Sequence, residues 1–106
     1  MRILKVAKDY IIKGFSGKAF VPRGLLDLSD YFRHNGSMHF SYESKDDVII
    51  ARSIDFRFGT IITSGKTRDE VDRNIKDAIL TAFEVPSSYA KEARIVNAKE
   101  REYALA

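Results

Sequence analysis

Three aspartates and two histidines are the residues of this chain whose types and spacing could support catalysis. Asp46, Asp47 and Asp55 suggest a two-metal nuclease centre, because two divalent cations need several converging carboxylates. Asp46 and Asp47 are adjacent, however, and aspartate is also favoured in tight turns for its local hydrogen bonds. His34 and His39 lie five residues apart in a chain without cysteine, with no paired partner at catalytic spacing. We therefore expect a turn and two ordinary polar histidines, with no catalytic activity, no metal and no cofactor.

The segment Ser64-Gly65-Lys66-Thr67 is similar to the end of a phosphate-binding P-loop. That motif requires a glycine five positions before its second glycine. Position 60 is a threonine, and Gly59 lies one residue too early. A P-loop domain also needs several parallel strands joined by crossover helices, which a chain of 106 residues cannot supply. We interpret the segment as a glycine turn before a helix.

A capped amphipathic helix is predicted to follow that turn. Thr67 and Glu70 have the spacing of a capping box: the Thr67 hydroxyl accepts the backbone N–H near Glu70, and the Glu70 carboxylate accepts the N–H of Thr67. Gly65, Thr67 and Glu70 thus form a structural helix-start motif, and Val85-Pro86 ends the helix. Apolar residues at helical spacing predict one buried stripe. Its members are Val71, Ile75, Ala78, Ile79, Ala82 and Phe83.

Strands are predicted on both sides of this helix. Met38, Phe40 and Tyr42 alternate with polar residues, which predicts a strand with one buried face. The other predicted segments are a turn at 45–47, a strand at 48–54 buried partly on both faces, a strand at 60–63, and one bent or bulged strand from 93–98 and 102–105. The result is an α+β fold in β-β-β-α-β order, with an antiparallel sheet and one main helix packed on one face.

Residues 38–106 resemble the HicB-like family. The resemblance is carried by the hairpin Phe40–Asp55 with its acidic turn, by Ile62–Val71, where Thr-x-Gly-x-Thr-x-x-Glu leads into the helix, and by Asn74–Ala78. It implies an antitoxin-like protein that binds and masks a small, basic, RNA-cleaving toxin, and a homo-oligomer. The chain has Val48 where the family usually has glycine.

Residues 1–37 predict a basic N-terminal extension. Before Met38, seven Lys or Arg oppose three Asp, a net charge of about +4. Residues 10–15 and 18–21 predict a hairpin, and Pro22 introduces a short helix. The segment Gly17–Leu25 is similar to the swapped-hairpin DNA-binding domain of the AbrB class. A DNA-binding transcriptional regulator is therefore the alternative function, with possible nucleic-acid contacts at Lys13, Lys18 and Arg23.

Composition places the chain among globular proteins. Its 44% apolar and 11% aromatic content is typical of one small domain with an appended arm. The sequence contains no run of 18 apolar residues, and charges at Arg2 and Lys5 interrupt the N-terminus too early for a signal peptide. We expect a cytoplasmic protein without a membrane partner.

Overall fold

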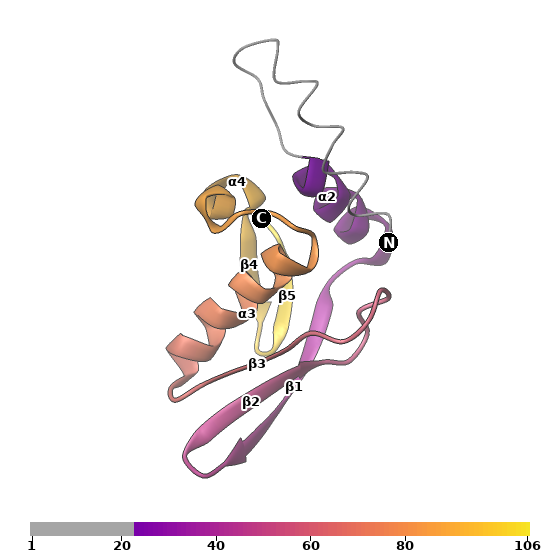
Figure 1. Ribbon diagram of the computed structural model, residues 1–106. Helices are drawn as coiled ribbons and strands as arrows, with labels where there is room; N and C mark the ends of the chain where they lie inside the picture. Colours follow the sequence, from indigo (N-terminus) through magenta and orange to yellow (C-terminus); the bar gives the residue numbers. More distant parts are fainter. Residues whose placement is uncertain (1–22) are drawn as a thin grey trace.

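A computed structural model describes residues 23–106 of the chain. The predicted hairpin at residues 10–21 lies outside this part. Within it, the chain forms one antiparallel sheet of five strands and three α-helices (Figure 1). The elements are, in order, α2 (Arg23–Asn35), β1 (Met38–Lys45), β2 (Val48–Ser53), β3 (Ile62–Gly65), α3 (Arg68–Ala82), the 3-10 helix η2 (Ser87–Tyr89), α4 (Ala90–Ala93), β4 (Ile95–Lys99) and β5 (Glu102–Leu105).

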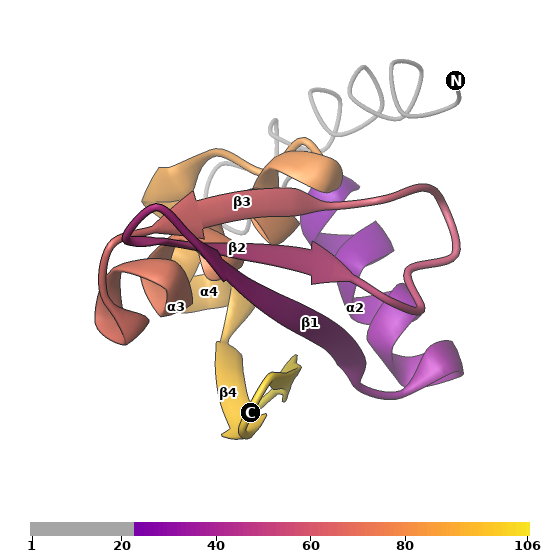
Figure 2. The same cartoon turned by 90° about the horizontal axis from the view of Figure 1, so that it is seen from below.

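The strands are ordered β3-β2-β1-β5-β4 across the sheet. β1 pairs with β2 from Phe40 to Lys45 but with β5 only at Met38 and His39. The junction between β1 and β5 is therefore narrow, and Figure 2 shows the β4–β5 hairpin turned away from β1–β3. The same view shows the helices on one side of β1–β3, with the other side uncovered by any element of residues 23–106.

The covered side of the sheet carries the hydrophobic core. Met38 and Phe40 are buried while His39 between them is exposed, which confirms the alternation predicted for this strand. The core also includes Leu28, Tyr31 and Phe32 of α2, so this helix packs with the sheet. The side chains with no accessible surface are Met38, Ala51, Val71, Ile75, Ile79 and Tyr103. Of the stripe predicted for α3, Val71, Ile75, Ile79 and Phe83 are thus buried, and Ala78 and Ala82 are partly buried against the core.

Gly36 ends α2. Its N–H donates to the Phe32 carbonyl at 2.9 Å, and its φ of 77° lies in the left-handed region that glycine adopts without a Cβ clash. The chain can then reverse direction into β1.

Three sequence predictions need correction. β3 spans 62–65 instead of 60–63, because at Ile61 the Ser53 hydroxyl, and not the Ser53 carbonyl, accepts the Ile61 N–H at 2.9 Å and the regular ladder begins one residue later. The C-terminal strand is in fact a hairpin of β4 and β5, with an irregular register between Asn97 and Lys99 and a positive φ at Arg101. β2 is not buried on both faces, because no described element covers its outer side.

Candidate partner-binding surface

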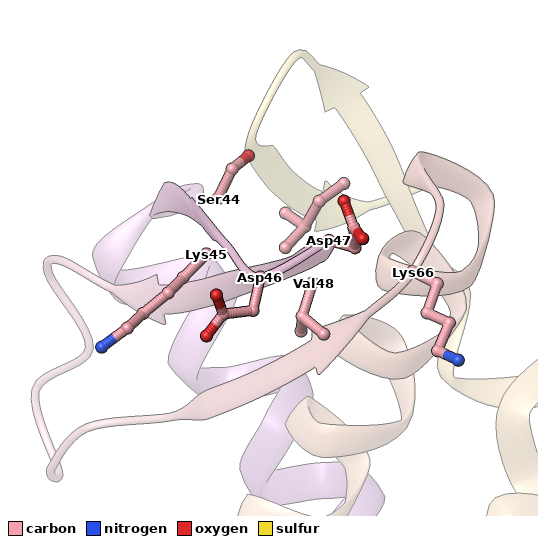
Figure 3. Close-up of a pocket in the computed structure, with 7 residues that line it drawn as sticks. Ser44, Lys45, Asp46, Asp47, Val48 and Lys66 are labelled. Carbon is pink, nitrogen blue, oxygen red and sulfur yellow. The ribbon is translucent and has the colours of Figure 1, made fainter.

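The aspartates considered for metal chemistry do not come together. Asp46 and Asp47 have positive φ angles of 51° and 64° and form the two-residue turn of the β1–β2 hairpin. Figure 3 shows their carboxylates directed to opposite sides of this turn, beside a shallow pocket rimmed by Lys45 and Lys66. Asp55 lies beyond the far end of β2. Residues 23–106 contain no group of three or more His, Asp or Glu arranged to hold a metal ion.

His39 on β1 instead contacts Asp55, in the loop after β2, and Glu102 on β5 at the narrow junction of the sheet. Its Nδ1 lies 2.7 Å from Asp55 Oδ2, and its Nε2 lies 3.6 Å from Glu102 Oε1 on β5. Burial alone would raise the pKa of Asp55, but hydrogen bonds from the backbone and side chain of His39 lower it below its usual value. His34 lies elsewhere, with Nδ1 2.9 Å from the Asp30 carbonyl of its own helix. Half-exposed at 49%, His39 serves as a link between strands.

The helix-start motif is occupied by its own side chains. Thr67 Oγ1 accepts the Glu70 N–H at 3.1 Å, as predicted. Glu70 Oε1 accepts the N–H of Lys66 at 2.8 Å, one residue before the predicted partner. A Cβ on Gly65 would lie 2.9 Å from the Val71 nitrogen, so glycine allows β3 to approach α3 closely. The N–H groups of Lys66 and Glu70 are thus bonded to these capping side chains, and the Glu70 carboxylate beside them repels an anion such as phosphate.

Of the three cations predicted to contact nucleic acid, Arg23 alone falls within the described residues. Its Nε lies 3.9 Å from Asp27 Oδ1, one turn along α2. Lys13 and Lys18 lie outside the described part, so the joint arrangement of these cations stays a prediction.

A cation cluster on the covered side was missed by sequence reasoning. The guanidinium carbons of Arg68 and Arg101 lie 5.7 and 5.1 Å from the centre of the Tyr42 ring. Both guanidinium groups also approach the Glu100 carboxylate, at 3.3 and 3.8 Å. The cluster ties the start of α3 to the β4–β5 turn, and its charges are already neutralised in part.

A polar network between α3 and the β4–β5 hairpin was also missed. The Tyr103 hydroxyl donates to Asp72 Oδ1 at 2.7 Å, Asn97 Nδ2 donates to the same oxygen at 3.2 Å, and Lys76 Nζ lies 3.1 Å from Asp72 Oδ2. Burial raises the pKa of the Tyr103 hydroxyl, and the bond to Asp72 adds to this effect. Burial would raise the pKa of Asp72 too, but bonds from Tyr103, Lys76 and Asn97 lower it. The network locks the hairpin to the helix.

The outer face of β1–β3 is left uncovered by the described elements. Successive residues of a strand alternate between faces, so the neighbours of the buried Phe40 and Ala51 point outward. The outward positions are His39, Ser41, Glu43 and Lys45 on β1, Val48, Ile50, Arg52 and Ile54 on and just after β2, and Ile62 and Ser64 on β3.

Four of these residues form what we name the outer aliphatic row, namely Val48, Ile50, Ile54 and Ile62. Ile62 lies opposite Arg52, and the Ile54 N–H donates to the His39 carbonyl at 2.9 Å, which continues the β1–β2 ladder. Ile54 and Ile62 are 66% and 56% exposed. Charged and polar side chains border the row on β1. Arg52 lies between Ile50 and Ile54 on the same face. An apolar strip among polar side chains is typical of a protein-contact surface.

The loop after this row is held in one position by α2. The Tyr31 hydroxyl accepts the Arg57 N–H at 3.0 Å and donates to the Asp55 carbonyl at 3.3 Å. The rings of Phe56 and Phe58 lie 5.3 and 5.4 Å from the Tyr31 ring. These contacts fix the end of the row near Ile54, so the surface is preformed.

Comparison of the chain with protein-family models, with curated proteins and with solved structures gave no match. A separate search of residues 23–106 found no helix long and apolar enough to cross a membrane.

Proposed function

We propose that this protein is a non-catalytic binding protein that recognises a partner protein through the outer face of β1–β3. The partner that we propose is the kind of small, basic, RNA-cleaving toxin that HicB-like antitoxins mask. The observation that carries the proposal is the outer aliphatic row, which no element of residues 23–106 covers and in which Ile54 and Ile62 are more than half exposed.

The order of the strands and the helix in residues 38–106 is compatible with a HicB-like domain. β1, β2, β3 and α3 correspond to the β-β-β-α part of the HicB-like pattern, and the β4–β5 hairpin takes the place of its last strand. The capped start of α3 is the feature on which the resemblance depends most. These correspondences support a HicB-like domain at residues 38–106, with residues 1–37 as an extension whose helix α2 packs into the core of that domain.

The chemistry of the outer face suits a protein partner. Covering the outer aliphatic row removes apolar surface from water, which is worth about 25 cal/mol per Å². Glu43 and Glu102 place carboxylates on the same face for a basic partner. Lys45, and Arg52 between Ile50 and Ile54, add positive charge to this face and restrict which partner charges fit. The row supplies affinity and the bordering charges supply specificity.

The test is an affinity pull-down from nuclease-treated lysate of the native host, with bound proteins identified by mass spectrometry. Wild type is compared with Ile54→Arg on the row and with Leu26→Arg, a matched change at an exposed apolar residue of α2. We expect wild type and Leu26→Arg to retain a small basic protein in stoichiometric amount, and Ile54→Arg to bind it at least about tenfold more weakly.

Equal retention by Ile54→Arg, or recovery of no protein, would refute the proposal. Recovery of nucleic acid from untreated lysate in place of a protein would support the alternative, a DNA-binding regulator that uses Lys13, Lys18 and Arg23.

A further inference from the structure

In the sheet formed by residues 23–106, β3 is an edge strand, and its outward backbone groups can be assigned from the pairing register. The Ser53 N–H donates to the Ile61 carbonyl at 2.9 Å, and the antiparallel ladder with β2 continues to Gly65. Because bonded positions alternate along an edge strand, residues 61, 63 and 65 face β2. The N–H and C=O groups of Ile62 and Ser64 therefore point away from the sheet. We call these groups the β3 edge.

One group of the β3 edge is already bonded. The side-chain amide of Asn74 on α3 donates to the Ser64 carbonyl at 2.7 Å. Within residues 23–106, the Ile62 N–H and C=O and the Ser64 N–H have no hydrogen-bond partner, so they can pair with a further strand. A strand that adds to this edge is therefore favoured in a register that does not use the Ser64 carbonyl as an acceptor.

We propose that a second copy of this chain adds to the β3 edge, antiparallel to it, about a two-fold axis at Ile62. The Ile62 N–H of each copy then donates to the Ile62 carbonyl of the other, and each Ser64 N–H donates to the Thr60 carbonyl opposite. Four backbone hydrogen bonds form without use of the Ser64 carbonyl. An axis at Thr63 would instead direct both Ile62 N–H groups to the carbonyls that Asn74 has bonded.

The side chains around this axis favour the same pairing. Ile62 is 56% exposed on the outer face, and Ile54 nearby is 66% exposed. A two-fold axis perpendicular to the sheet brings the two Ile62 side chains next to each other, with an Ile54 on each side. One self-complementary apolar strip results. It also joins the two outer faces into one surface with two copies of the proposed partner site.

The first experiment measures the mass of the purified full chain by sedimentation equilibrium over a wide concentration range. We expect a reversible dimer in wild type. Ile62→Lys should raise the dimer dissociation constant at least about tenfold, because lysine at an edge opposes strand addition. Leu26→Lys is the matched control and should leave it unchanged. A wild type that stays monomeric, or an Ile62→Lys dimer as tight as wild type, would overturn the proposal.

The second experiment tests the register, and it is possible because the chain has no cysteine. Residues paired across an antiparallel ladder have Cα atoms about 5.5 Å apart, within reach of a disulfide. Ile62→Cys should form an interchain disulfide on mild oxidation, whereas Ser64→Cys, two residues from the axis, should not. Cross-linking of Ser64→Cys without Ile62→Cys would refute the register. Neither experiment contains a partner protein. A failure of dimerisation would therefore leave the proposed partner binding standing, and a failure of partner binding would leave dimerisation standing.

Discussion

Gly65→Ala is the most direct test of how β3 and α3 fit together. The new Cβ would lie 2.9 Å from the Val71 backbone nitrogen and 3.0 Å from Val71 Cγ2. Val71 has no accessible surface, and its N–H donates to the Thr67 carbonyl at 2.9 Å, so it cannot move without breaking the first turn of α3. Overpacking of this kind costs about 1–3 kcal/mol, offset by about 0.4–1 kcal/mol from the stiffer unfolded chain.

We therefore expect a net loss of about 1–2 kcal/mol in the free energy of unfolding, measured by urea denaturation with an unchanged m-value. Ser64→Ala is the control, because it alters an exposed neighbour and keeps the backbone carbonyl that Asn74 contacts. It should change stability by less than about 0.5 kcal/mol. A Gly65→Ala protein as stable as this control would show that β3 and α3 are not as close as described, and the phosphate-loop interpretation would need reconsideration.

Two further predictions concern the core and the polar network. Ile75→Ala removes most of a side chain with no accessible surface and should destabilise the fold by about 2–5 kcal/mol in the same urea assay. A loss below about 0.5 kcal/mol would mean that the apolar stripe containing Ile75 is not the buried face of α3. Asp72 has a lowered pKa in the folded state, so its contribution to stability is present above the unfolded pKa of about 4 and is lost as pH falls through the lower folded value. Asp72→Asn should therefore be less stable than wild type at neutral pH and should match it in strong acid, as measured by unfolding across a pH series. An equal loss in the free energy of unfolding at every pH would refute the role of the Asp72 charge.

Local features of the fold could be predicted from the sequence because their partners are close in the chain. Thr67 and Glu70 lie within one turn of helix, and the spacing alone identified the cap. Even there, Glu70 bonds to the N–H of Lys66 and not to that of Thr67, because a flexible side chain can reach either donor. The turn at Asp46 and Asp47 was equally predictable, since the two residues between two strands determine the hairpin.

Features built from distant segments could not be predicted in this way. The carboxylate of Asp72 meets the Tyr103 hydroxyl across 31 residues, and His39 meets Asp55 across 16. Such pairs depend on the order of strands in the sheet, which periodicity does not reveal. The division of the C-terminal segment into β4 and β5 has the same origin, because the positive φ at Arg101 occurs at a residue type that rarely marks a turn.

The apolar run from Val48 to Ile54 connects the sequence to the proposed function. Alternating strands usually place polar residues outward, yet this segment carries aliphatic residues on both sides, which is typical of a strand covered on both faces. Among residues 23–106 the helices cover one face only, and Ile54 and Ile62 stay more than half exposed on the other. The cover that such a pattern favours must therefore come from outside these residues. A bound partner over the outer face would supply it. We expect partner binding to protect Val48, Ile50 and Ile54 from solvent and to leave α3 unchanged.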